Sequence, residues 1–145
     1  MADPLRFFLA GSTGLLAECG RRLLDAGQSV VAVWAPDPAT IPGFLVGAAG
    51  PGTLPEALAR AEFDYLLSVA NPCLLGPEAL ARARCGAINY HDAPLPRYAG
   101  RHAAPRAILR GESTHGVTWH QMIPRVDAGA ILVQEVFPVD PEETS

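Results

Sequence analysis

The sequence predicts an α/β domain with a mainly parallel, twisted sheet, helices on both faces, and an antiparallel or mixed strand pair at its end. Short apolar runs alternate with helical patterns over residues 1–90, which favours parallel strands joined by helices. The strand–helix–strand pattern of residues 5–34 implies a right-handed crossover. Val-rich alternation in residues 115–139 is typical of adjoining strands.

The composition predicts one soluble globular domain. The chain has 145 residues, 49% hydrophobic and 18% charged, with a net charge of −4. All 11 basic residues are Arg, and because they are scattered we expect no nucleic-acid surface. This sequence shows no apolar leader or membrane-spanning run. Cys19, Cys73 and Cys85 form no Cys-x-x-Cys pair, which predicts reduced thiols, no zinc site and a cytoplasmic location.

The first predicted elements are a strand, a turn and a helix. Leu5–Ala10 is a short apolar run, and the Gly-Ser-Thr-Gly sequence after it predicts a turn. Ser12 or Thr13 can cap a helix whose apolar residues recur at helical spacing until Gly27. Ser29–Trp34, rich in Val, predicts the second strand.

The Gly-Ser-Thr-Gly turn also suggests a dinucleotide-binding loop, with Asp37 as the acid that would bind a ribose. However, the Gly-x-Gly-x-x-Gly pattern is incomplete, and Asp37 lies between two prolines beyond the strand. A tight turn into a helix is therefore the favoured interpretation.

The middle of the chain predicts a loop, a short helix and a third strand. Pro36–Gly52 is rich in Pro, Gly and Ala without periodicity, which predicts a loop. Thr53-Leu-Pro-Glu56 has the capping-box pattern and predicts a helix to about Ala61. Phe63–Ala70 predicts the third strand, which Asn71-Pro72 ends.

Two further helices are predicted on either side of a fourth strand. Gly76-Pro-Glu starts a helix that ends near Arg84, and Ala87–Tyr90 is the strand. A run from about Ala103 to Arg110 predicts the second helix, closed by Gly111.

The last part of the chain predicts strands around a loop. His115–Ile123 and Ala130–Val139 are expected to form a hairpin or adjoining strands, although Pro124–Gly129 is longer than a tight hairpin turn. Pro138–Ser145 has the pattern of a cap that leads into a further helix.

Polar residues of complementary chemistry lie at the end of the fourth strand and in the late loop. Asn89 and His91 are two apart, so as strand residues they point to the same face. Asp127 lies in a turn-like segment that could bring its carboxylate back to His91. An amide donor, an imidazole and a carboxylate suit stabilisation of an oxyanion in acyl transfer with movement of a proton. Singly, each residue also has a structural explanation as a strand-end cap, a satisfied histidine or a turn residue.

The same stretch resembles a known family. Asn89-x-His91, Leu-Pro four residues after the His, Gly100, Gly-Glu, Gly-Val-Thr, Met and Asp127-x-Gly129 look like the 10-formyltetrahydrofolate-dependent formyltransferases. The register matches without a gap from Asn89 to Gly129. The chain most resembles the formyltransferase-like domains at the start of some nonribosomal peptide synthetases, through His-Asp-Ala-Pro-Leu-Pro-Arg-Tyr-Ala-Gly at 91–100.

The resemblance implies a Rossmann-like formyltransferase fold and a catalytic domain over residues 1–145, truncated at its C-terminal end. It implies that Asn89 and His91 stabilise the oxyanion and that Asp127 orients and charges His91. The implied donor is 10-formyltetrahydrofolate, with no metal. The implied acceptor is an amine, which in the finer match is an aminoacyl group on a carrier domain.

The resemblance also implies that the segment after the third strand binds the folate largely through its backbone. The corresponding residues here are Val69, Ala70, Asn71 and Leu74. For each of them, a plain loop or core packing is an equally good explanation.

The chain departs from the family pattern close to His91. Ala93 stands where many members have Ser, and Ala99 where an Arg is frequent. Asp92 places a second carboxylate beside the histidine, although in a continuing strand it would point to the opposite face.

The other histidines lack support from the motif. His102 follows the loop glycine and could reach the pocket. His115 has no assigned role, and His120 lies in a predicted strand, where we expect a structural histidine.

Two alternatives stay open beside the transferase. One keeps the folate but uses water, as a formyltetrahydrofolate hydrolase. The other is a catalytically silent, formyltransferase-like module for docking or scaffolding, which the departures at Ala93 and Ala99 keep open.

Overall fold

The computed structural model describes residues 2–37, 39 and 53–142. The chain forms two compact units, residues 1–88 and 89–145, and the division falls within one strand. In the described ranges, no helix has both the length and the apolar character needed to cross a membrane. The prediction of a single catalytic domain over residues 1–145 stays a prediction.

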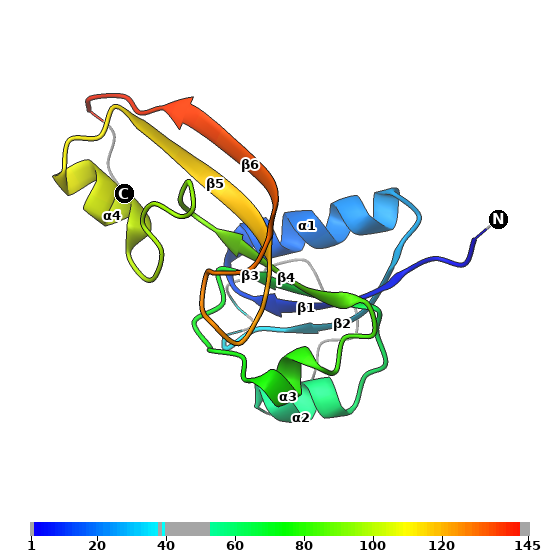
Figure 1. Ribbon diagram of the computed structural model, residues 1–145. Coiled ribbons are helices and arrows are strands. Elements are labelled where there is room, and N and C mark those ends of the chain that lie inside the picture. Colours follow the sequence, from blue (N-terminus) through cyan, green and yellow to red (C-terminus); the bar gives the residue numbers. More distant parts are fainter. Residues whose placement is uncertain (1, 38, 40–52, 143–145) are drawn as a thin grey trace. The chain divides into compact units, whose positions relative to one another are not determined.

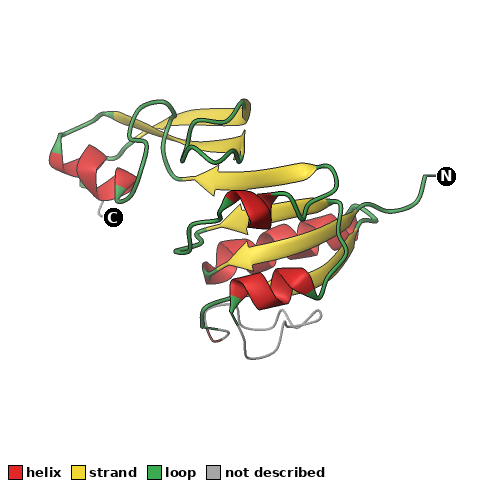
Figure 2. Ribbon diagram, turned by 60° about the horizontal axis from the view of Figure 1, so that its bottom comes forward, coloured by secondary structure: helices red, strands yellow, loops and turns green. Residues whose placement is uncertain are grey.

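The first unit holds parallel strands with helices on both faces. Its strands are β1 (Arg6–Gly11), β2 (Ser29–Trp34) and β3 (Tyr65–Val69), and its helices are α1 (Thr13–Asp25), α2 (Leu54–Ala59) and α3 (Pro77–Leu80). β1 pairs in parallel with both β2 and β3 (Figure 2). Figure 1 shows α1 on one side of these strands and α2 and α3 on the other. The fully buried core side chains include Phe8, Leu9, Leu16, Leu58, Phe63, Leu66 and Val69.

The Gly-Ser-Thr-Gly turn ties the end of β1 to the end of β3. A Cβ at Gly11 would overlap the carbonyl oxygen of Val69, so only glycine permits this approach. Ser12 occupies the N-cap position of α1, as predicted, but its side chain makes no cap bond. Its hydroxyl donates instead to the carbonyl of Ala70 at 2.8 Å. The prediction of side-chain capping by this residue is therefore wrong, because the hydroxyl is directed to the carbonyl of Ala70 and its oxygen accepts no N–H from the first turn of α1.

Local sequence signals set most of the boundaries. The predicted capping box is present: Thr53 N–H donates to Glu56 Oε2 at 2.8 Å, and this bond lowers the pKa of the Glu56 carboxyl. α3 ends earlier than predicted, at Leu80 rather than near Arg84. The reason is that the backbone turns toward the start of β3, where Arg84 N–H donates to the carbonyl of Phe63 at 3.3 Å. Of the predicted loop 36–52, only residues 36, 37 and 39 are described, and the predicted C-terminal cap likewise runs into residues 143–145, outside the described ranges.

The second unit is built on an antiparallel strand pair. Its elements are the end of β4 (Gly86–His91), α4 (Ala103–Leu109), β5 (Thr114–Gln121) and β6 (Ile131–Pro138). β5 and β6 pair antiparallel, with Thr114 opposite Pro138. The strands follow the order β2-β1-β3-β4-β5-β6 in a six-stranded sheet. The predicted α/β class, with a mainly parallel sheet that ends in an antiparallel pair, is confirmed.

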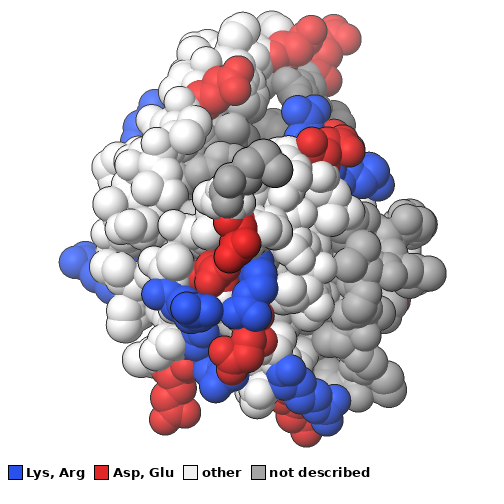
Figure 3. Space-filling model, turned by 90° about the vertical axis from the view of Figure 1, so that its right-hand side faces the viewer, with Lys and Arg blue, Asp and Glu red and all other residues white. Residues whose placement is uncertain are grey.

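Charged side chains of the first unit are arranged as pairs rather than as a patch of one sign. Glu18 pairs with Arg22 at 2.8 Å and with Arg21 at 3.1 Å, while Asp64 lies 3.8 Å from Arg84. Figure 3 shows Arg and acidic side chains interspersed on one face of the molecule. Because both partners of the Glu18 pairs are exposed, these pairs add little to stability.

Thr118 anchors the segment that follows β4. Its hydroxyl, fully buried, donates to the carbonyl of Ala93 at 2.7 Å and accepts from the N–H of Leu95 at 3.2 Å. Gln134 Nε2 also donates to this hydroxyl at 2.9 Å and to the carbonyl of Leu95 at 2.8 Å. The threonine of the Gly-Val-Thr sequence therefore fixes the backbone that leads away from His91.

Replacing Thr118 by Val is expected to lower the free energy of unfolding by about 1–3 kcal/mol, because buried backbone groups lose their partner. Chemical denaturation of wild type and variant measures this change. Thr114→Val, at an exposed position at the start of the same strand, is the matched control and should change the free energy by under about 0.5 kcal/mol. Equal effects of the two substitutions would contradict the assigned role of the buried hydroxyl.

Candidate functional site

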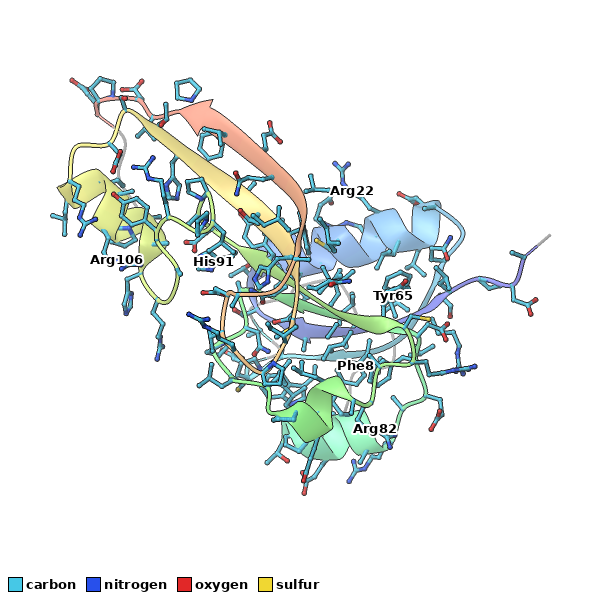
Figure 4. The ribbon with its side chains drawn as sticks, in the orientation of Figure 1. Phe8, Arg22, Tyr65, Arg82, His91 and Arg106 are labelled. Carbon is cyan, nitrogen blue, oxygen red and sulfur yellow. The ribbon has the colours of Figure 1, made fainter. Side chains whose placement is uncertain are left out.

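His91 lies at the end of β4 with both ring nitrogens engaged. Its side chain is 9% exposed. Nε2 lies 2.9 Å from the carbonyl oxygen of Tyr98, and since a carbonyl can only accept, Nε2 carries a proton. Nδ1 lies 3.6 Å from Oδ2 of Asp127. A doubly protonated ring would direct one N–H toward each of these two oxygens. Figure 4 labels His91 near the end of β4.

Asp127 directs its carboxylate toward two imidazoles and one backbone N–H. Its side chain is 8% exposed, and its backbone is left-handed, with φ 51°, a conformation that Asp adopts more readily than most residues. Oδ2 accepts from the N–H of Gly100 at 2.8 Å. Oδ1 lies 3.4 Å from Nε2 of His120. The late loop thus brings the acid back to the strand end, as the sequence suggested.

Asn89 joins this cluster through His120, for which the sequence predicted only a structural role. Its Nδ2 lies 3.2 Å from Nε2 of His120, and His120 Nδ1 lies 2.9 Å from the carbonyl of Gln121. His120 is therefore part of the polar cluster. One sequence signal could have found it: Thr118 and His120 are two apart on β5 and share a face, as Asn89 and His91 do on β4.

The glycine of Asp-x-Gly is required by a close backbone approach. A Cβ at Gly129 would overlap the carbonyl oxygen of Gln121, the same carbonyl that faces Nδ1 of His120. The N–H of Gln121 donates to the carbonyl of Ala130 at 2.9 Å. The loop that carries Asp127 is therefore seated directly on the end of β5.

Replacing Gly129 by Ala is expected to lower the free energy of unfolding by about 1–3 kcal/mol, because the added methyl group must push backbone apart. A thermal or chemical denaturation curve measures the loss. Gly14→Ala is the matched control: a Cβ there meets nothing within 4 Å, and the residue lies in α1, where Ala is preferred to Gly. A Gly129→Ala variant as stable as the Gly14→Ala variant would contradict the close approach.

Aromatic and charged contacts hold the loop that supplies the Tyr98 carbonyl. The Tyr98 hydroxyl donates to Glu112 Oε1 at 2.6 Å, and Arg97 donates to the same oxygen at 2.7 Å. The Tyr98 hydroxyl, followed by the Arg97 guanidinium, lowers the pKa of the Glu112 carboxyl. The guanidinium of Arg106, labelled in Figure 4, lies 5.5 Å from the centre of the Tyr98 ring.

The positions that depart from the family pattern have plain structural places. Ala93 is fully buried in an apolar cluster with Tyr98, Ala103 and Ala107. Asp92 is exposed, whereas His91 is buried. Ala99 is exposed, and its carbonyl accepts a hydrogen bond from the Arg106 side chain at 2.9 Å.

The two histidines outside the polar cluster have other surroundings. His102 is exposed, and His115 Nε2 donates to the carbonyl of Asp92 at 2.7 Å.

The segment after β3 belongs to the first unit. Val69 is fully buried and Ala70 is exposed with φ 48°, while Leu74 is 83% exposed. The Asn71 side chain accepts from the N–H of Cys73 at 3.1 Å through Oδ1, and its Nδ2 is buried without a hydrogen-bond partner. The segment therefore holds an apolar side chain and an amide donor close together in sequence. In the described ranges, no group of three or more His, Cys, Asp or Glu could hold a metal ion.

A family model and a curated relative both identify this chain as similar to formyltransferases. Residues 20–145 match the family model described as formyl transferase. The chain is 34% identical over 164 residues to methionyl-tRNA formyltransferase of Stutzerimonas stutzeri (strain A1501). The alignment covers 99% of this chain and 52% of that protein. The chain thus spans about half the length of this curated relative.

Two solved structures share the fold of this chain. Glycinamide ribonucleotide transformylase 1 from Symbiobacterium toebii matches with a TM-score of 0.81 and 22% identity, over 99% of this chain and 78% of that one. A formyltetrahydrofolate deformylase from Pseudomonas syringae pv. tomato str. DC3000 matches with a TM-score of 0.73 and 24% identity, over 99% and 54%. At such identities the likeness establishes the fold alone.

Proposed function

The chain belongs to the formyl transferase family, and from this premise we propose that it transfers a formyl group from 10-formyltetrahydrofolate to an amine. The observation that carries the proposal is the contact of buried Asp127 with His91, 3.6 Å from Oδ2 to Nδ1, on the strand that also holds Asn89. The assignment of these three residues as catalytic is part of the proposal.

Asn89 and His91 stabilise the oxyanion in this proposal. Attack of the amine nitrogen on the formyl carbon forms a C–N bond and leaves negative charge on the formyl oxygen. The Asn89 side-chain N–H and an N–H of His91 donate to that oxygen. The His91 Nε2 proton, which faces the Tyr98 carbonyl at 2.9 Å, becomes available when the substrate oxygen replaces that carbonyl. Donors fixed in a buried site stabilise such charge strongly.

Asp127 keeps His91 oriented and charged in the proposed reaction. Its carboxylate is held in place by the Gly100 N–H at 2.8 Å, so it faces Nδ1 in a fixed geometry. A carboxylate beside an imidazole favours the protonated ring. His91 then passes a proton to the departing folate nitrogen as its bond to carbon breaks, and the proton that the attacking amine loses restores the proton on His91.

The donor-binding segment is proposed to be the stretch after β3. The stretch comprises Val69, Ala70, Asn71 and Leu74, of which two have side chains that suit a folate ring: the Asn71 Nδ2 donor lacks a partner, and Leu74 offers an exposed apolar surface. The side chain of Val69 is fully buried, so this residue would contribute through its backbone. A pteridine needs hydrogen-bond partners at its edge and apolar contact on its faces. Fluorescence titration with a 5-deazafolate analogue should show weaker binding to Leu74→Asp than to wild type.

The acceptor is proposed to be an aminoacyl group held on a carrier domain, because the sequence of residues 91–100 resembles that of peptide-synthetase formyltransferase-like domains. A cytoplasmic location goes with this proposal. The relative from Stutzerimonas stutzeri is named for a different acceptor, methionyl-tRNA. Both acceptors offer a primary amine on an aminoacyl group, so the reacting atoms are the same.

The test is a product assay with 10-formyltetrahydrofolate and separate acceptors. The protein is incubated with an aminoacyl-loaded carrier domain, with methionyl-tRNA, or with no acceptor, and formylated product and free formate are measured. Formylated carrier-bound amino acid supports the full proposal. Formylated tRNA alone retains formyl transfer and overturns the carrier as acceptor.

Two further outcomes would overturn formyl transfer itself. Rapid formate release in the absence of any amine would identify a hydrolase. No product with any acceptor, together with no heat of binding of a folate analogue by calorimetry, would identify a silent module. The assay therefore separates the transferase from both alternatives.

A further inference from the structure

The ring of His120 is fixed by the backbone in one neutral tautomer. Its Nδ1 lies 2.9 Å from the carbonyl oxygen of Gln121, which can only accept, so Nδ1 carries a proton in every charge state. The neutral ring therefore has its lone pair on Nε2. Gly129 backs this carbonyl so closely that a Cβ would overlap it. The tautomer is thus determined by the packing of the loop end against β5.

Nε2 of His120 faces two groups, of which one requires a hydrogen-bond acceptor and the other a hydrogen-bond donor. Asn89 Nδ2, a donor, lies at 3.2 Å, and Asp127 Oδ1, an acceptor, lies at 3.4 Å. A neutral ring accepts from the amide, whereas a cationic ring donates to the carboxylate and then faces the amide with a second donor.

Asp127 supplies one carboxylate to two imidazoles, His91 and His120. Asp127 Oδ2 faces Nδ1 of His91, and its Oδ1 faces Nε2 of His120. The three side chains are 3–9% exposed, so a second imidazolium would be buried without a carboxylate of its own. A cationic His91 is therefore compatible with a neutral His120.

We propose that His120 is a positioning residue that sets the orientation of the Asn89 amide. Neutral His120 accepts one N–H of Asn89 through Nε2, which keeps the amide nitrogen on this side and leaves the second N–H for the substrate oxygen. A proton on Nε2 removes that acceptor and favours rotation of the amide, so that its oxygen faces the ring. This inference rests on the proposed formyl transfer, in which Asn89 is an oxyanion donor.

Two amide substitutions separate the Nε2 role from the Nδ1 role. Gln has the reach to place an oxygen near the position of Nε2, whereas Asn can place an N–H near the position of Nδ1 but not an acceptor at Nε2. We expect His120→Gln to keep kcat within about 5-fold of wild type and His120→Asn to lose about 10–100-fold, the scale of a misplaced oxyanion donor. KM for the folate should change little in either variant.

The difference in kcat between these two variants is the decisive readout. An Asn variant as active as the Gln variant would overturn the proposal, since the Nδ1 contact alone would then suffice.

A measurement without turnover keeps the inference separate from the proposed function. ¹⁵N NMR of the imidazole nitrogens in the free protein at neutral pH should show His120 with a protonated Nδ1 and an unprotonated Nε2. A proton on Nε2 there would overturn the inference whether or not the protein transfers formyl groups. Absence of formyl transfer from wild type, with the expected spectrum, would overturn the proposed function and with it the catalytic meaning of the amide orientation.

Discussion

Replacing His91 by Asn is expected to lower kcat for formyl transfer by about 10²–10⁴-fold, the range for loss of a positioned proton donor and oxyanion partner. The variant keeps a polar side chain at the end of β4 but cannot become a cation or carry a proton to the folate nitrogen. Because Asn89 stays in place, KM for the folate should change by less than about 3-fold. Steady-state kinetics with 10-formyltetrahydrofolate and the best acceptor measure both quantities.

The matched control for His91→Asn is His102→Asn. His102 is exposed and has a left-handed backbone, φ 58°, which Asn tolerates well. This variant should keep wild-type kcat. If His91→Asn retained more than about a tenth of wild-type kcat, proton transfer by this ring would not be part of the mechanism.

The sequence was sufficient to predict the strands and the general arrangement of the sheet. Apolar runs such as Ser29–Trp34 matched a strand to the residue, because a buried parallel strand needs a continuous apolar run. The capping box at Thr53 and Glu56 marked the start of α2, since its signal is local. Where tertiary contacts override local preference, as at the early end of α3, the pattern was misleading.

The composition of the polar cluster was only partly predictable. The spacing of Asn89 and His91 followed from strand periodicity, and the return of Asp127 was suggested by its turn. The two-residue spacing of Thr118 and His120 indicates only that they share a face of β5, whereas the contact of His120 with Asn89 depends on the arrangement of neighbouring strands, which that spacing does not encode. The Tyr98 carbonyl at His91 was equally inaccessible, because a backbone oxygen leaves no signature in residue types.

Replacing Asp127 by Asn is expected to lower kcat by about 100-fold, comparable to the loss of one oxyanion-hole donor. The amide keeps the size of the carboxylate, and its oxygen can still accept from the Gly100 N–H, which in the wild-type structure lies 2.8 Å from Oδ2. It removes the negative charge that faces His91 and presents an N–H to one of two imidazoles. His91 then loses the partner that favours its cation, so the transition state loses a charged donor. Single-turnover rates with saturating folate measure this step directly.

A control variant and the stability of the Asp127→Asn variant show whether the lower kcat reflects lost chemistry or lost structure. Asp92→Asn makes the same change at the exposed carboxylate next to His91, so it should keep kcat within about 3-fold, as surface substitutions usually do. The free energy of unfolding of Asp127→Asn should fall by no more than about 1 kcal/mol, since removing a buried charge also removes its desolvation cost. A stable Asp127→Asn variant with wild-type kcat would show that the acid only orders the loop and takes no part in the proposed chemistry.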